Sequence, residues 1–190
     1  IHSGIGEILK VHAIDGTKSF KEINQNFDKL LIDKTVILEK IYQSLKIKKR
    51  YIELDEFDRG PRNIFNYGHS FGHAIESATN YKMPHGIAVS LGCDIANFTA
   101  MKLGVSSKTI FLSMHEVLRK NYIKFINLNI PKEKFYTALK NDKKNINNQS
   151  LSLVLPNKRG KIFIDKYENN ENFRLIIDEF FNHYRLDNLI

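Results

Sequence analysis

Three histidines are the first residues of this 190-residue chain whose types and spacing could do chemistry. The stretch "NYGHSFGHAIE" holds His69 and His73, and "MPHGIAV" adds His85. Residues four apart lie on one face of a helix, so His69 and His73 could grip one metal ion or exchange protons. In zinc proteases that use such a pair, a Glu follows the first histidine. Ser70 stands there in this chain, which argues against that class.

A carboxylate near the start of the chain could complete a metal site. Glu7 has Lys10 three residues on, and therefore on the same helical face. Two imidazoles, one carboxylate and an open position make a catalytic zinc set. Two plainer interpretations stay open: a histidine that is hydrogen-bonded inside the fold, and a surface pair of Glu7 with Lys10 that contributes little.

The elements that must position these residues are mostly helices, by the spacing of their apolar residues. The pattern predicts helices over 4–15, 18–31, 35–49, 63–80, 87–104, 106–120, 131–141 and 170–186. A polar loop is expected from 51 to about Arg62, because that segment contains Gly60 and Pro61. Two short apolar runs at 151–156 and 161–165, separated by "NKRG", predict a β-hairpin.

Two apolar stripes are expected to pack against other helices rather than bind a cofactor. Asp33 is a possible break between the two helices that carry them. The first stripe consists of Phe20, Ile23, Phe27, Leu30 and Leu31, and the second of Ile37, Ile41 and Leu45.

Composition limits the possible partners. The net charge of +8 comes from lysines that are spread along the chain and often alternate with acids, which is typical of a solvated surface. We therefore expect an anionic small substrate and no nucleic acid. No apolar run approaches the roughly 20 residues that cross a bilayer, so no membrane partner is expected. The single cysteine, Cys93, fits a reducing compartment and predicts a cytoplasmic protein.

Four separated motifs, in one order from residue 3 to about 160, resemble the 3-dehydroquinate synthase family of sugar-phosphate cyclases. They are "SGIGEILK", "KIKKRYIELDEFDRGPR", "RNIFNYGHSFGHAIE" with "HGIAVSLG", and "LKNDKK" followed by "LSLVLPNKRG". The resemblance implies that zinc or cobalt is held by Glu7, His69 and His85. It places His73 near the substrate phosphate instead, so the pair four apart would not share the ion.

The resemblance also implies the reaction. The substrate would be the anionic sugar acid 3-deoxy-D-arabino-heptulosonate 7-phosphate, converted to 3-dehydroquinate and phosphate in the shikimate pathway, which supplies chorismate and aromatic amino acids. NAD would be used catalytically. The implied catalytic residues are Lys10, Asp58 and His73, and the implied substrate contacts are Lys48, Arg62, Asn66, His73, Lys143 and Lys144.

The fold that the resemblance implies is mainly α: a helical C-terminal domain with a small β-hairpin, covering residues 1–190. The N-terminal α/β domain that carries most of the NAD contacts in the family has no counterpart here, since no strand is followed by G-x-G-x-x-G. The chain is therefore expected to be the later part of a longer, homodimeric, two-domain enzyme and to be inactive alone.

Two substitutions depart from the family pattern. Asp58 replaces a longer acid, and Ile87 replaces a Glu next to His85, where an apolar side chain cannot hydrogen-bond a ligand. Three alternatives follow. One is a related cyclase of polysaccharide or secondary metabolism. Another is a metal-dependent, NAD-linked polyol dehydrogenase, which would need no Arg62 or Asn66 for phosphate. The last is a non-catalytic helical module, which Ile87 favours.

Overall fold

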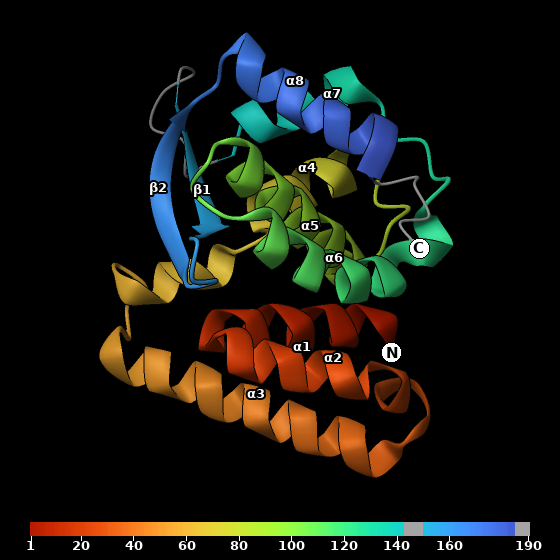
Figure 1. Ribbon diagram of the computed structural model, residues 1–190, viewed down its shortest axis with the longest axis vertical. Coiled ribbons are helices and arrows are strands. Elements are labelled where there is room, and N and C mark those ends of the chain that lie inside the picture. Colours follow the sequence, from red (N-terminus) through yellow and green to blue (C-terminus); the bar gives the residue numbers. More distant parts are fainter. Residues whose placement is uncertain (143–149, 185–190) are drawn as a thin grey trace.

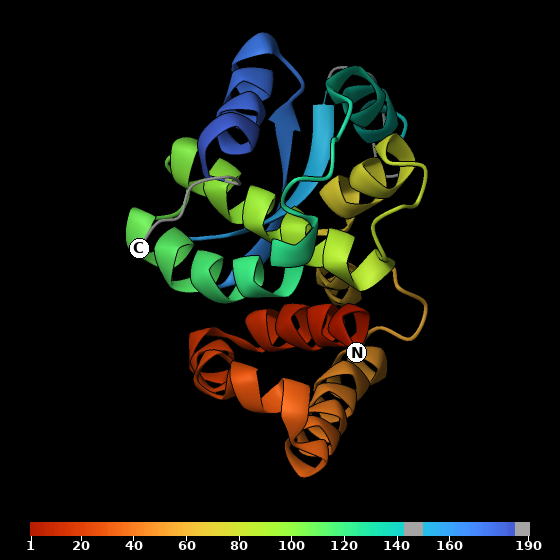
Figure 2. The same ribbon diagram turned by 90° about the vertical axis from the view of Figure 1, so that its right-hand side faces the viewer.

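Helices form two stacked groups in the computed structural model, which describes residues 1–142 and 150–184 (Figure 1). Helices α1 (His2–Asp15), α2 (Thr17–Ile32) and α3 (Lys34–Leu54) make the lower group. The view turned by 90° shows the remaining elements above them, with α1 facing this upper group (Figure 2). The metal ligands expected from the sequence are therefore split between the two groups.

The upper group contains five helices, a hairpin and three short helical segments. In chain order they are η1 (Pro61–Asn66), α4 (His69–Ala78), α5 (His85–Lys102), α6 (Lys108–Tyr122), η2 (Ile123–Phe125), α7 (Lys132–Lys140), β1 (Ser150–Pro156), β2 (Ile162–Glu168), α8 (Glu171–Glu179) and η3 (Phe180–Tyr184). No helix in the described part of the chain has both the length and the apolar character needed to cross a bilayer.

Helix α5 is the centre of the core. Every residue from Gly86 to Ala100 is buried, and the helix packs on α1, α4, α6 and β1. Two of its polar side chains have buried partners: Asn121 donates to the Ser90 hydroxyl at 2.8 Å, and the Tyr122 hydroxyl donates to Asp94 at 2.6 Å. Such partners offset the cost of burying a polar group. The predicted helix 87–104 thus exists, and it begins at His85.

The hairpin prediction is confirmed. Strands β1 and β2 are antiparallel, with Ser150 opposite Glu168 and Pro156 opposite Ile162. The last predicted helix, 170–186, is α-helical only to Glu179 and then widens into the π-helical turn η3. Its final two residues lie outside the described ranges.

The lower group confirms one predicted stripe and corrects the other. Phe20, Ile23, Phe27 and Leu30 are buried in α2, as expected. In α3 the buried residues are Lys40, Ser44 and Ile47, whereas Ile41 and Leu45 of the predicted stripe are exposed. The ammonium group of Lys40 is paired with Glu22, which allows a charged residue to occupy the packed face. Asp33 accepts hydrogen bonds from the N–H groups of Thr35 and Val36 and so begins this helix.

Helix α3 also continues into the segment predicted to be a loop. It ends at Leu54, and the Tyr51 ring packs edge-on against Phe65 at 5.1 Å between centroids. This aromatic contact supports the last turn of α3 against η1.

The predicted helix over 63–80 is confirmed only from His69 to Ala78, because the chain turns at Gly68. This residue has φ +75°, a left-handed conformation that favours glycine. A Cβ there would lie 2.4 Å from the Cys93 sulfur, so α5 also leaves no room for a side chain. The turn separates the short helix η1, which carries Arg62, from α4, which begins at His69.

Helices α1 and α5 touch through their backbones. A Cβ on Gly6 would lie 1.9 Å from the Gly86 carbonyl oxygen, and a Cβ on Gly86 would lie 1.8 Å from the Ser3 carbonyl oxygen. Neighbouring helices normally lie 8–10 Å apart at distances set by their side chains, so glycine permits this approach. It brings Glu7, the residue after Gly6, against the start of α5.

We predict that Gly6→Ala destabilises the protein by about 1–3 kcal/mol, because the added methyl must separate two backbones. Gly4→Ala is the matched control: it lies in the same helix with nothing within 4 Å of its Cβ. Replacing a helical glycine at such a site should stabilise by about 0.5–1 kcal/mol. Urea unfolding of both variants checks this, and equal free energies of unfolding would contradict the backbone contact.

Candidate functional site

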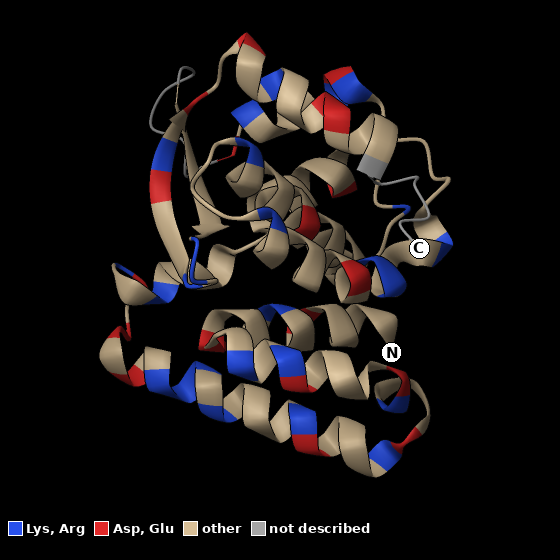
Figure 3. Ribbon diagram, in the orientation of Figure 1, with Lys and Arg blue, Asp and Glu red and all other residues tan. Residues whose placement is uncertain are grey.

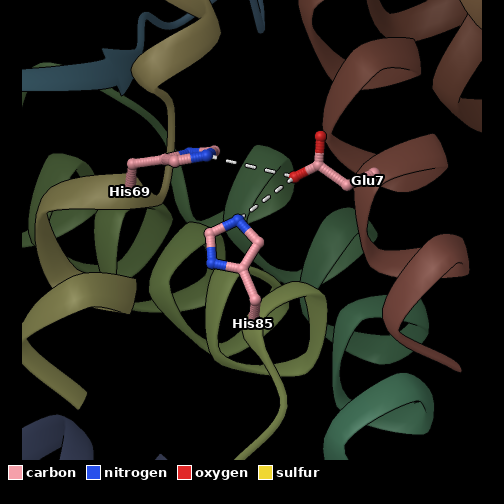
Figure 4. A group of neighbouring side chains, drawn as sticks. All are labelled: Glu7, His69 and His85. Atoms are coloured by element: carbon pink, nitrogen blue, oxygen red, sulfur yellow. Dashed lines mark ion pairs between the residues drawn. The ribbon is translucent and has the colours of Figure 1, made fainter. Parts of the chain in front are cut away.

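Glu7, His69 and His85 come together from α1, α4 and α5 (Figure 4). The Glu7 Oε1 atom lies 4.0 Å from His69 Nε2 and 3.9 Å from His85 Nε2, and one ligand atom from each residue lies within 4.8 Å of the others. A tetrahedral ion with bonds of about 2.1 Å needs donors roughly 3.4 Å apart. Small side-chain rotations therefore suffice for the three residues to share one ion.

Hydrogen bonds on the far side of each imidazole set its orientation. His69 Nδ1 lies 3.2 Å from the Tyr67 carbonyl oxygen, and His85 Nδ1 lies 3.2 Å from both Glu76 carboxylate oxygens. Because these partners only accept, Nδ1 carries the proton in both rings. Each unprotonated Nε2 then faces Glu7, which is the tautomer that a metal needs.

Glu76 is a residue that the sequence interpretation missed. A signal was present: it lies seven residues after His69, which places it on the same face of α4. Glu76 also bears on Ile87, which cannot hydrogen-bond a metal ligand. The Ile87 side chain is packed in the core with 5% exposure. The carboxylate that supports His85 comes from α4, so an apolar residue at 87 leaves that histidine supported.

The alternative of a surface pair between Glu7 and Lys10 is wrong. Lys10 is only 4% exposed, and its Nζ lies 3.0 Å from both Glu7 oxygens and 3.4 Å from His69 Nε2. Burial lowers the pKa of Lys10, and the Glu7 carboxylate partly opposes this shift. The ammonium occupies the lone pairs that a metal would use, so an ion and Lys10 compete for these two ligands.

The same surroundings leave both ligands in the states that bind metal. Burial lowers the pKa of His69 to about 3, and the Lys10 charge acts in the same direction. Burial raises the pKa of Glu7, but the charge and hydrogen bond of Lys10, with His69 and Lys48, lower it by more in total. His69 is therefore neutral and Glu7 ionised near neutral pH. Neither has to lose a proton when an ion binds.

A cleft of about 270 Å³ opens beside His69. Its lining contains three cationic side chains, so the hollow suits an anionic ligand. Elsewhere the charges are mixed, as along α2 and α3 (Figure 3). The cleft is lined by Lys10, Lys48, Ile52, Asp58, Arg62, Phe65, Asn66 and His69. Five residues that were predicted to be catalytic or substrate-binding thus line this cleft together with His69, a predicted metal ligand. They are Lys10, Lys48, Asp58, Arg62 and Asn66.

Asp55 holds the loop that presents Arg62, and the sequence interpretation did not single it out. Its carboxylate accepts hydrogen bonds from the N–H groups of Arg59 at 2.9 Å, Gly60 at 2.8 Å and Arg62 at 3.1 Å. These donors, that of Arg59 most strongly, hold the pKa of Asp55 below its usual range. Asp58 adopts φ +54° within the same loop. The first Asp of the "DEFD" motif was the available signal.

The remaining predicted site residues are His73, Lys143 and Lys144. His73 is exposed and does not line the cleft; its ring centroid lies 5.3 Å from that of His69 and 5.8 Å from that of His85. It therefore lies beside the two predicted histidine ligands, on their solvent side. Lys143 and Lys144 lie outside the described residues.

Known proteins resemble this chain over most of its length. The family model described as 3-dehydroquinate synthase C-terminal matches residues 4–145. The 3-dehydroquinate synthase of Clostridium acetobutylicum is 31% identical over 178 residues, covering 93% of this chain and 49% of the relative. That of Prochlorococcus marinus (strain MIT 9215) is 36% identical over 167 residues, covering 85% and 46%. The chain spans about half the length of these curated relatives.

Solved structures share the fold at low sequence identity. The 2-epi-5-epi-valiolone synthase of Streptomyces hygroscopicus, described with NAD⁺ and Zn²⁺ bound, gives a TM-score of 0.78 at 16% identity, covering 95% of this chain and 51% of that one. A 2-deoxy-scyllo-inosose synthase with carbaglucose-6-phosphate, NAD⁺ and Co²⁺ gives 0.75 at 18%, covering 94% and 52%. The predicted mainly helical C-terminal domain with a hairpin is thereby confirmed.

We predict that Glu76→Gln weakens Zn²⁺ binding about 10- to 100-fold. The neutral amide is a weaker hydrogen-bond acceptor for the His85 Nδ1–H group than the carboxylate is. Calorimetric titration of the metal-free protein measures the affinity. Glu56→Gln, in the exposed loop after α3, is the matched control and should leave the affinity unchanged. An unchanged affinity in Glu76→Gln would contradict the supporting role.

We also predict that the His69 ring stays neutral in the folded, metal-free protein down to about pH 4, given its lowered pKa. In the unfolded chain the same ring takes up a proton near pH 6.5. Its contribution to stability is therefore complete above pH 6.5 and is lost as the pH falls from 6.5 towards 3. Histidine side-chain NMR follows the titration, and a midpoint near 6.5 for His69 would refute the prediction.

Proposed function

The chain belongs to the 3-dehydroquinate synthase family, and we propose that it is the metal- and substrate-binding C-terminal part of a carbon–oxygen lyase of that family. For the whole enzyme we propose the conversion of 3-deoxy-D-arabino-heptulosonate 7-phosphate to 3-dehydroquinate and phosphate, the second step of the shikimate pathway. One observation carries the proposal: Glu7, His69 and His85 converge beside a cleft lined by Lys10, Lys48 and Arg62.

The domain boundaries and the NAD site are part of the proposal. Residues 1–190 would form one domain, and a preceding domain would carry most of the dinucleotide contacts. The coverage of about half of each relative supports this. In the described ranges the strands form only the β1–β2 hairpin, with no strand–glycine loop–helix unit, so these residues do not fit NAD alone. A cytoplasmic location and a homodimer remain predictions.

The donor set fits zinc or cobalt. Two imidazole nitrogens, one carboxylate and an open position suit either ion, which would polarise substrate hydroxyl groups and lower the cost of removing their protons. Lys10 is the proposed partner for such a proton, because its Nζ lies 3.4 Å from His69 Nε2 and its burial lowers its pKa. The neutral amine can accept the proton, and the ammonium can return it.

The cleft residues would hold the substrate in one conformer. The planar guanidinium of Arg62 can bind a carboxylate or phosphate through two parallel hydrogen bonds. Lys48 adds a second positive charge, and Asn66 can donate to an oxygen. Asp58, in the same cleft, would orient a substrate hydroxyl or one of these cations. Restricting the substrate in this way is what makes an intramolecular ring closure fast.

On the solvent side of the metal ligands, His73 is proposed to contact the phosphate that leaves. Its ring stacks at 28° to that of His85, so a group bound to the ion would lie within its reach. Lys143 and Lys144 are proposed as further phosphate contacts on the motif resemblance.

A related sugar-phosphate cyclase is the second candidate. Ile87 departs from the family pattern, and one structural relative is described with carbaglucose-6-phosphate. A polyol dehydrogenase is disfavoured because it would need no cationic cleft beside the metal ligands. A non-catalytic module is disfavoured because Glu7, His69 and His85 keep metal-binding geometry.

The assay is phosphate release from the heptulosonate phosphate. We predict that residues 1–190 with Zn²⁺ and NAD⁺ release none, while the full-length enzyme releases one phosphate per dehydroquinate without net NADH. NADH accumulation would favour a dehydrogenase, and release only from other sugar phosphates would favour the related cyclase.

Arg62→Lys in the full-length enzyme tests the anion cleft. Loss of one charge-assisted hydrogen bond, about 1.5–3 kcal/mol, should lower kcat/KM roughly 10- to 150-fold. Arg59→Lys is the matched control, since Arg59 does not line this cleft and lies over the Phe57 ring. Equal effects of the two substitutions would argue against a substrate contact by Arg62.

A further inference from the structure

A second group of metal-binding side chains lies on the other side of His85. One ligand atom each from His73, Glu76 and His85 lies within 4.8 Å of the others. We propose that these residues form a second divalent-cation site, which shares His85 with the first site through the opposite ring nitrogen. With this site filled, the centre would hold two ions bridged by the imidazolate ring of His85.

The geometry of His85 allows this bridge. Its Nε2 faces Glu7 at 3.9 Å, whereas its Nδ1 faces both oxygens of Glu76 at 3.2 Å. The two nitrogens point away from each other, so one ring can contact an ion on each side. His73 lies three residues before Glu76, on the same face of α4, and its ring lies 5.8 Å from that of His85.

Burial and charge favour entry of a cation at this second site. The Glu76 side chain is 11% exposed and forms the base, while the His85 side chain is 45% exposed and His73 is open to solvent. Glu76 forms an ion pair with His85. Glu7, by contrast, lies 3.0 Å from Lys10 and 3.6 Å from Lys48, which an ion at the first site must oppose.

The donors indicate which ions bind. Two imidazoles and one carboxylate suit Zn²⁺ or Co²⁺, whereas Mg²⁺ and Ca²⁺ prefer oxygen ligands only. An open position would remain for water. The second ion takes the place of the Nδ1 proton of His85, which leaves to solvent, and takes over Glu76 as a ligand. It should therefore bind more weakly than the first ion.

Binding there has a consequence that rests on the proposed function. The second ion would occupy His73, the residue proposed to contact the leaving phosphate. Excess Zn²⁺ should then inhibit the full-length enzyme, while the first equivalent supports activity. The site itself depends only on the three ligands.

Metal counting on the 190-residue chain tests the second site. Calorimetry and native mass spectrometry with Zn²⁺ should give two equivalents for the wild-type chain, the second at least tenfold weaker. His73→Gln should keep only the tight ion and Glu7→Gln only the weak one. His183→Gln replaces another exposed histidine and should still bind two. Circular dichroism checks that each variant is folded.

One equivalent in the wild-type chain, or two in His73→Gln, would overturn the inference. If Glu7→Gln left the count unchanged while His73→Gln removed one ion, the second site would stand and the proposed catalytic site would fail. A Co²⁺ titration of the wild-type chain needs no variant. Two successive changes in the visible spectrum are expected, and a single change complete at one equivalent would again overturn the second site.

Discussion

The backbone contact between α1 and α5 is the constraint on which the site depends. Glu7 belongs to the lower group of helices, and the two histidines belong to the upper group. Only a glycine-to-glycine approach, Gly6 on Gly86, lets a short carboxylate from one group reach imidazoles from the other. The proposed metal site would therefore also link the two groups: an ion bound to Glu7, His69 and His85 would tie them together and stabilise the folded state.

Charge is arranged along a row of three side chains with His85 in the middle. Glu7 lies on its Nε2 side with the buried Lys10, and Glu76 lies on its Nδ1 side. Burial, together with the positive charge of Lys10, keeps His69 unprotonated, and the same charge keeps Glu7 ionised. Lys10 must move away from these ligands when an ion enters. The side chains that would bind a metal ion, Glu7 and His69, therefore also contact Lys10, the proposed proton-exchanging group. The proposed chemistry requires both to be close together.

Sequence patterns correctly predicted the elements that depend on the local periodicity of apolar residues. They failed where contacts with residues distant in the sequence determine the structure. The stripe of α2, the buried α5 and the hairpin follow from apolar spacing alone. The face of α3 was predicted wrongly because pairing of Lys40 with Glu22 lets a charged residue be buried. The break at Gly68 depends on contact with Cys93, and the role of Glu76 depends on where α5 places His85. The motif resemblance located Glu7, which no local pattern distinguishes from a surface acid.

The most direct test of the central claim is X-ray absorption of the chain loaded with one equivalent of Zn²⁺. Shared binding by Glu7, His69 and His85 predicts two imidazoles and a carboxylate oxygen at about 2.0–2.2 Å and no sulfur. A zinc–sulfur distance of about 2.3 Å, which would come from Cys93, would contradict the account. So would a spectrum with one imidazole or none.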